Sequence, residues 1–195
     1  MRPPTLEEAR AALTTRLGKA TFAHSEAVAE TAARLAREYG VDPDAARMAG
    51  LLHDWCKECG DEELLAAAAL HGIDVTVADR ARPRLLHARV AAAELRETFP
   101  GLPTEVVHAV EAHTFGDDHM DDLARVVYVA DMIEPGRTHR GVHELRSSVG
   151  RVPLHELMLA ACAMTMRHVI DSRRPLHPDS VGTWNALVLA EPRKA

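Results

Sequence analysis

The sequence predicts an all-helical domain, and three observations support this. First, 47% of the 195 residues are hydrophobic but only 4% are aromatic, so alanine, leucine and valine must fill the core, which favours closely packed helices over sheets. Second, apolar residues recur at helical spacing between recognisable helix start and stop signals. Third, the run Val126–Val129 has strand propensity, but no second strand is available to pair with it, so a helix is expected there too. The length fits a single domain.

The first three expected helices have clear boundaries. The run TLEE at residues 5–8 is a capping-box pattern that opens a helix running to about residue 17. A second helix covers about residues 20–39 and stops at Gly40. Asp42 and Pro43 form an N-cap followed by a first-turn proline, and they open the third helix, which ends in the pair His53-Asp54.

The later helices follow from the same kinds of signal. Acidic residues start a helix at residue 61 that ends near residue 71, and the irregular stretch from residue 73 to residue 83 is expected to be a loop. Further helices are expected at about residues 83–99, 103–113, 121–133, 153–172 and 180–187. No internal repeat or low-complexity segment interrupts this pattern.

Charge and targeting features exclude several classes of protein. The net charge of −6 argues against a nucleic-acid backbone as the main partner. The N-terminus lacks the apolar core of a signal peptide, and no stretch is long enough to cross a membrane. Three cysteines without a secretory signal indicate reduced thiols, so a cytoplasmic protein is expected. Cys56 and Cys59 form a CxxC, but the second pair that a zinc site needs is missing.

Six polar residues interrupt the apolar faces of five expected helices. A single core histidine usually has only a structural hydrogen bond, and an isolated His-Asp pair at a helix end usually faces water. Six imidazoles and carboxylates that converge on one point in the core would match the ligand preferences of iron, manganese or zinc. These candidate metal ligands are His24, His53, Asp54, His87, His113 and Asp131.

Six protein ligands exceed what one catalytic ion needs, because catalysis requires open coordination positions. Two divalent ions that share Asp54 as a bridge fit the number better. The shell of one ion would be completed by His24, His53 and Asp131, and that of the other by His87 and His113. The sequence therefore predicts a buried dinuclear metal site, which would generate hydroxide at neutral pH and hold the oxygens of a phosphoryl group.

The order of these residues, with the sequence around them, resembles the HD-domain metal-dependent phosphohydrolases. Within that class it is most similar to the YqeK-type symmetrical diadenosine tetraphosphatases. The matching segments are AGLLHDWCKE at 49–58, PRLLH at 83–87, AHTFG at 112–116, VVYVADMIEPGR at 126–137 and VHELR at 142–146. The resemblance covers about residues 15–190 and implies a single HD-domain helical bundle over residues 1–195.

The resemblance also implies a reaction. A metal-bound hydroxide would cut diadenosine tetraphosphate at its centre and release two ADP, with iron as the metal usually associated with activity and manganese or zinc as alternatives. Asp54, as the bridging ligand, and Lys57 are the residues expected to carry catalysis. The residues expected to contact the phosphate chain are Lys57, Thr114, Gly116 and Arg137.

Two alternative functions stay open at the level of sequence. The same site could serve another nucleotide, such as a nucleoside monophosphate or a cyclic dinucleotide, because HD folds host several activities. The chain could also bind metal and nucleotide as a regulator without turnover. The expected partner is a dinucleoside polyphosphate, with neither nucleic acid nor membrane, and the alanine run Ala66–Ala69 leaves a homodimer open.

Overall fold

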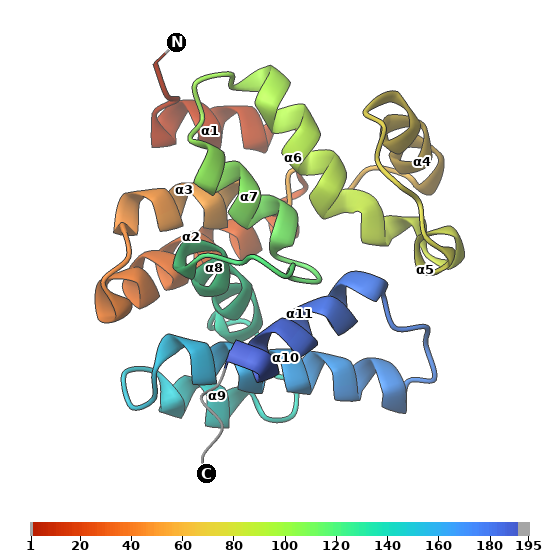
Figure 1. Ribbon diagram of the computed structural model, residues 1–195. Coiled ribbons are helices and arrows are strands. Elements are labelled where there is room, and N and C mark those ends of the chain that lie inside the picture. Colours follow the sequence, from red (N-terminus) through yellow and green to blue (C-terminus); the bar gives the residue numbers. More distant parts are fainter. Residues whose placement is uncertain (1, 191–195) are drawn as a thin grey trace.

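The computed structural model describes residues 2–190, and these residues form helices joined by loops, with no strand among them. The elements are α1 (Leu6–Thr14), α2 (Lys19–Tyr39), α3 (Pro43–Leu52), α4 (Asp61–Leu70), α5 (Val77–Ala81), the 3₁₀ turn η1 (Pro83–Leu86), α6 (His87–Thr98), α7 (Thr104–Ala112), α8 (Asp122–Ile133), α9 (Val142–Ser148), α10 (Leu154–Asp171) and α11 (Pro178–Ala190). In Figure 1, α8 lies in the middle, with α2 beside it, α1, α3, α6 and α7 above it and α9 to α11 toward the bottom. Within residues 2–190, no helix combines the length and the apolar character that a membrane crossing requires.

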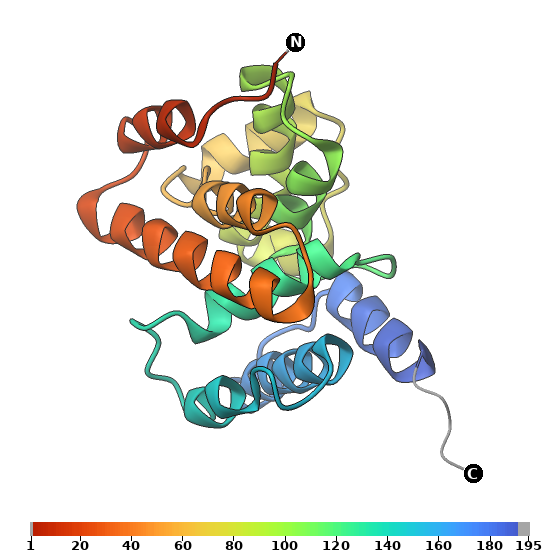
Figure 2. The same ribbon diagram turned by 90° about the vertical axis from the view of Figure 1, so that its left-hand side faces the viewer.

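The centre of the fold forms where α2 packs against α3 and α8, an arrangement visible from the side in Figure 2. Gly50 on α3 faces the backbone of α2. A Cβ atom at Gly50 would lie 2.9 Å from the Cα atom of Ala29 and 3.1 Å from the carbonyl oxygen of Val28. Glycine therefore permits the close approach of the two helices, and this approach places His53, one turn later, against α2.

Adding a methyl group at Gly50 should destabilise the protein. We expect Gly50→Ala to lower the free energy of unfolding by about 1–3 kcal/mol, because backbone atoms of α2 cannot move aside as a flexible side chain would. Urea denaturation measures this change. The matched control is Gly60→Ala, where the nearest atom to the new Cβ would be a Glu63 oxygen at 3.6 Å. Equal stabilities of the two variants would contradict the close packing of α2 and α3.

Most of the expected elements are confirmed, including a helix rather than a strand at residues 122–133. The expected loop before Pro83 is wrong in part, since Thr76 and Asp79 form a capping box that opens the one-turn helix α5. The helix expected from Pro83 begins instead as the 3₁₀ turn η1 and becomes α-helical only at His87. Near the C-terminus α11 is longer than expected, because Pro178 serves as a first-turn residue and the helix continues to Ala190.

Candidate metal centre

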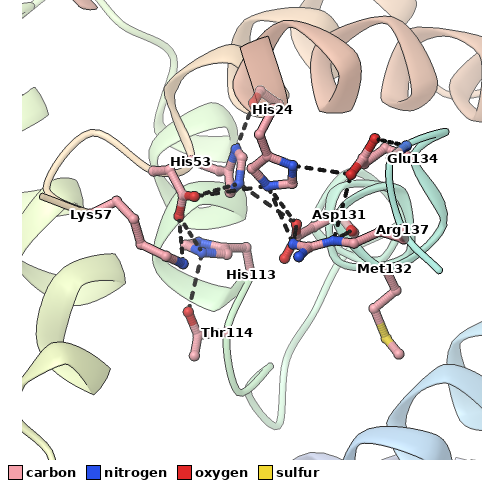
Figure 3. A network of polar contacts seen from close by, with 12 residues as sticks. His24, His53, Lys57, His113, Thr114, Asp131, Met132, Glu134 and Arg137 are labelled. Carbon is pink, nitrogen blue, oxygen red and sulfur yellow. Dashed lines mark hydrogen bonds and ion pairs between the residues drawn. The ribbon is translucent and has the colours of Figure 1, made fainter. Parts of the chain in front are cut away.

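The six candidate ligands converge at the centre of the fold. His24 lies on α2 and Asp131 on α8, while His53 and Asp54 directly follow α3. The two remaining ligands stand at helix ends, with His87 as the first residue of α6 and His113 directly after α7. Figure 3 shows imidazoles and carboxylates from these elements pointing toward one another. The structure thus brings together all six residues that the sequence singles out.

Three of the imidazoles are held in one orientation by the backbone. In each ring Nδ1 lies 2.7 Å from the carbonyl oxygen three residues earlier, and a carbonyl can only accept a hydrogen bond. The pairs are His53 with Gly50, His87 with Arg84, and His113 with Val110. Nδ1 therefore carries the proton in each ring, and the lone pair of Nε2 points into the centre, as in metal-bound histidines.

Asp54 connects the two halves of the cluster. Its side chain is buried, and its oxygens face different imidazoles. Oδ2 lies 3.4 Å from Nε2 of His53 and 3.8 Å from Nε2 of His24. Oδ1 lies 3.2 Å from Nε2 of His87 and 3.6 Å from Nε2 of His113. This is the arrangement that a carboxylate bridging two ions requires.

One contact within the cluster sets two lone pairs against each other. Nε2 of His87 lies 3.1 Å from Nε2 of His113, although both rings already donate through Nδ1. Nε2 of His53 is buried and has no hydrogen-bond partner among the described residues. Such a concentration of buried acceptors is unfavourable unless cations lie among them. Two groups of ligand atoms have the spacing for an ion, namely His24 with His53 and Asp131, and His53 with Asp54 and His113.

The protonation states of Asp54, Asp131, His87 and His113 suit metal binding. Burial, only partly offset by Asp54, lowers the pKa of His113 to about 4, and burial also lowers the pKa of His87. Burial alone would raise the pKa of Asp54, but the surrounding imidazoles outweigh it and hold that pKa well below its usual value. The same holds for Asp131, where His24 and the charges of His53 and Arg137 lower the pKa despite burial. Near neutral pH the carboxylates are ionised, and His87 and His113 are neutral.

The expected substrate contacts lie at opposite ends of the cluster. Nζ of Lys57 donates to Oδ1 of Asp54 at 3.1 Å, and the hydroxyl of Thr114 lies 3.1 Å from Nε2 of His113. At the other end, the guanidinium of Arg137 pairs with Asp131 and donates to the Asp131 carbonyl at 2.8 Å. Figure 3 shows Lys57 and Thr114 on one side and Arg137 on the other.

Gly116 lies outside this polar network. The residue is buried, and its φ of +74° favours glycine. A Cβ atom there would lie 2.5 Å from side-chain atoms of Thr183 on α11. The turn after His113 and the packing of α11 therefore both require a glycine at this position. The sequence alone had indicated only that the backbone at Gly116 could approach a phosphate.

Glu134 is a member of the site that sequence reasoning missed. It follows Asp131 by three residues, so both carboxylates project from the same face at the end of α8. Its side chain is only 5% exposed, and Oε1 lies 3.3 Å from Nδ1 of His24. Glu134 thus orients the His24 ring from behind. The signal available in the sequence was this spacing after a run of apolar residues.

Replacing Glu134 by glutamine should weaken metal binding without leaving a cavity in the core. We expect Glu134→Gln to reduce metal affinity by about 10–100-fold, the usual effect of removing a carboxylate that orients a metal-binding imidazole. Competition with a chromophoric chelator measures this affinity. Glu105→Gln, an exposed change in the first turn of α7, is the matched control. Equal affinities in the two variants would contradict this role of Glu134.

A second buried network supports the loop beside His113. Asp79 is fully buried, accepts from Arg89 at 2.6 Å and lies 3.3 Å from Nε2 of His177. The His177 ring stacks on Phe115 with centroids 3.9 Å apart. The Thr183 hydroxyl lies between two carbonyl acceptors, that of Phe115 at 3.0 Å and that of Asp179 at 2.8 Å. The segment before α11 thus fastens the loop that carries Thr114. Nothing in the sequence around His177 distinguishes it from an exposed histidine.

The cysteines take no part in the centre. Cys56 is buried and Cys59 is half-buried, and all three thiols are free. Burial raises the pKa of the Cys56 thiol, and burial raises the pKa of Cys162 to about 11. Thiolates are the metal-binding and nucleophilic form of cysteine, so these residues stay unreactive near neutral pH.

The fold and the centre agree with a family comparison. Residues 21–136, from the first turn of α2 to the turn after α8, match the family model described as HD domain. The chain is therefore an HD-domain protein, and the expected HD-domain helical bundle is confirmed. A divalent-metal-dependent hydrolase is what this family implies for the centre.

Relatives of similar length define the family more narrowly. Three curated proteins named "Bis(5'-nucleosyl)-tetraphosphatase, symmetrical" match the chain. The protein from Bacillus subtilis (strain 168) is 31% identical over 93% of this chain and 97% of its own length, and that from Halalkalibacterium halodurans is 30% identical over 87% and 90%. The protein from Staphylococcus aureus is 33% identical over 72% of each chain. The chain belongs to the family of symmetrical bis(5'-nucleosyl)-tetraphosphatases, as the sequence motifs indicated.

A solved structure shares the whole fold. The crystal structure of a Clostridium acetobutylicum protein, described as a predicted HD superfamily hydrolase involved in NAD metabolism, superimposes with a TM-score of 0.89 at 31% sequence identity. The superposition covers 97% of this chain and 100% of that chain. The helices after residue 136, beyond the HD-domain match, are therefore also part of a shared architecture.

Proposed function

We propose that this protein hydrolyses diadenosine tetraphosphate at its centre and releases two ADP. The relatives' names supply the substrate class, and one observation in the chain itself supports the chemistry. Buried Asp54 presents each of its oxygens to a different set of imidazoles, so one carboxylate can bridge two divalent ions. Two adjacent ions are a recurring means of transferring phosphoryl groups to water.

The proposed ligands of the two ions are the six converging residues. The first ion would be held by His24, His53 and Asp131, the second by His87 and His113, and Asp54 would bind both. We propose iron as the resident metal, with manganese or zinc as alternatives, because imidazole and carboxylate ligands suit all three. When bound, such ions lower the pKa of water and stabilise the charge on phosphoryl oxygens.

The side chains at the two ends of the centre would hold the phosphate chain. Lys57 donates to Asp54 and keeps a positive charge at one end, where the Thr114 hydroxyl is also available. Arg137 places a guanidinium at the other end. A guanidinium binds two phosphate oxygens at once, whereas an ammonium acts as a point charge. Gly116 would contribute indirectly, through the turn that directs Thr114 to the centre.

The test is product analysis on diadenosine tetraphosphate, with metal content determined on the same anaerobically prepared sample. ADP as the sole product, together with close to two ions per chain, is the expected result. AMP plus ATP would overturn symmetric cleavage while leaving the metal centre in place. A panel with NAD, a nucleoside monophosphate and a cyclic dinucleotide tests the alternative substrates. Turnover of a panel compound without turnover of diadenosine tetraphosphate would reassign the substrate, and nucleotide binding without any product would favour a regulator.

We also propose that the protein works in the cytoplasm. All three of its cysteines are free thiols, and two of them are buried. Free thiols are typical of proteins from reducing compartments.

A further inference from the structure

A cavity of about 830 Å³ lies directly beside the metal centre. It is bounded by the end of α8, the loop at residues 137–141, α9 and α10. Asp131 and Arg137 belong to both the cavity and the centre, so the two spaces are continuous at the Arg137 end. Apart from Asp131 and Met132, every lining residue follows residue 136, where the HD-domain match ends.

The floor of the cavity is apolar and held in place. Met132, Leu145, Ala160 and Met164 supply it. The Thr165 hydroxyl donates to the sulfur of Met132 at 3.4 Å and in turn accepts from the buried Tyr128 hydroxyl at 3.2 Å. In Figure 3 the Met132 side chain points away from the imidazoles, toward the C-terminal helices. Met132 is therefore held in the floor by a hydrogen-bond chain within the protein.

The backbone also makes room for this floor. Gly141 lines the cavity with φ of +88°, and a Cβ atom there would lie 2.7 Å from the sulfur of Met164. A side chain at residue 141 would thus displace Met164 from its place in the floor.

The rim of the cavity carries charges of both signs. Besides Arg137, its lining includes the exposed arginines Arg140 and Arg167, the exposed carboxylates of Glu144 and Asp171, and the imidazoles of His139 and His168. Among residues 2–190, neither Arg140 nor Arg167 makes an ion pair, in contrast to Arg137. Unpaired guanidinium groups at the edge of an apolar floor are available to an anionic ligand.

We propose that this cavity binds one nucleoside of the dinucleotide, with its base on the methionine floor and its phosphates directed past Arg137 into the metal centre. The inference rests on the proposed function for the identity of the substrate. Methionine sulfur packs well against aromatic rings, and a nucleotide fits a site of this volume, within the roughly 300–1,000 Å³ of small-molecule pockets. The metal centre holds phosphates of any origin, so recognition of the nucleoside is assigned to the C-terminal helices.

The test is a calorimetric titration of the metal-loaded protein with ADP, adenosine and inorganic pyrophosphate, none of which it turns over under the proposed reaction. Ala160→Phe fills the cavity from an exposed position on α10, so folding should be retained. We expect Ala160→Phe to weaken the binding of ADP and of adenosine by about tenfold or more and to leave the affinity for pyrophosphate unchanged. Ala69→Phe, on the exposed side of α4, is the matched control and should change none of the three affinities.

A second variant separates the rim from the floor. The double variant Arg140→Ala with Arg167→Ala should weaken the binding of ADP more than that of adenosine. Arg34→Ala, an exposed change on α2, is the control and should change neither affinity. Unchanged ADP affinity in Ala160→Phe would overturn the proposal, as would wild-type protein that binds ADP no more tightly than pyrophosphate. These outcomes do not depend on turnover. If Ala160→Phe weakens ADP binding but the wild-type protein does not cleave diadenosine tetraphosphate, the assignment of the cavity stands and the proposed function is wrong.

Discussion

Replacing Asp54 by alanine is expected to abolish hydrolysis and to empty the metal centre while the protein stays folded. The two oxygens of this carboxylate face different sets of imidazoles, so its loss should release both ions rather than one. The rate should fall by about a thousandfold or more, since removing even a single stabilising group from an active site commonly costs 10²–10³. Metal analysis and single-turnover rates on the same preparation measure the two effects, and circular dichroism reports the fold.

Asp61→Ala, an exposed carboxylate in the first turn of α4, is the matched control and should retain both metal and rate. Asp54→Asn adds a second test, because the amide keeps the volume but loses the charge. Retention of one ion in Asp54→Ala would contradict the bridging role and would place Asp54 on a single ion. Full activity would remove Asp54 from the mechanism altogether.

The largest expected effect on stability comes from Asp79→Ala, although this residue is remote from the ligands. Its fully buried carboxylate accepts from Arg89 and lies against His177, so its loss leaves a guanidinium without a counter-charge. We expect the free energy of unfolding to fall by about 3 kcal/mol, the lower end for breaking a buried ion pair, because the Arg89 side chain is 15% exposed. Denaturant unfolding followed by circular dichroism measures this change.

The double variant Asp79→Ala with Arg89→Met should recover part of that stability, because it also removes the charge that Asp79→Ala leaves unpaired. Asp74→Ala, in the loop before α5, is the control, since Arg89 contacts only the backbone carbonyl of Asp74. If the double variant is as unstable as the two single losses added together, the ion pair is not the source of the effect.

The sequence was sufficient to identify the six residues that converge, because each of these polar side chains is unfavourable in its apolar surroundings. His53 and Asp54 follow an apolar helix, and Asp131 stands in the run VVYVADMI, so burial without a cation would be unfavourable. The helix at residues 122–133 was predictable for a related reason, since its valines had no strand to pair with. Such local patterns are informative because they show which contacts an element must make elsewhere in the fold.

Other parts depended on contacts between distant residues, which no local pattern contains. The sequence showed that Glu134 follows Asp131 but not that it lies against His24, which is 110 positions away. Gly50 looks like an ordinary helix interior residue until α2 is placed against it. The short helix α5 was missed because its capping box, Thr76 to Asp79, is followed by a single turn. Propensity rules need a longer periodic segment to identify a helix.

The attachment of α11 to the loop after His113 has a consequence for the time at which the protein becomes active during synthesis. The Thr183 side chain, which lies 68 residues after Phe115 in the chain, contacts the Phe115 carbonyl and packs over Gly116. The six ligands have all left the ribosome well before that partner does. A nascent chain can therefore gather its imidazoles early, but the loop that presents Thr114 acquires its support only when nearly all of the described chain has been translated.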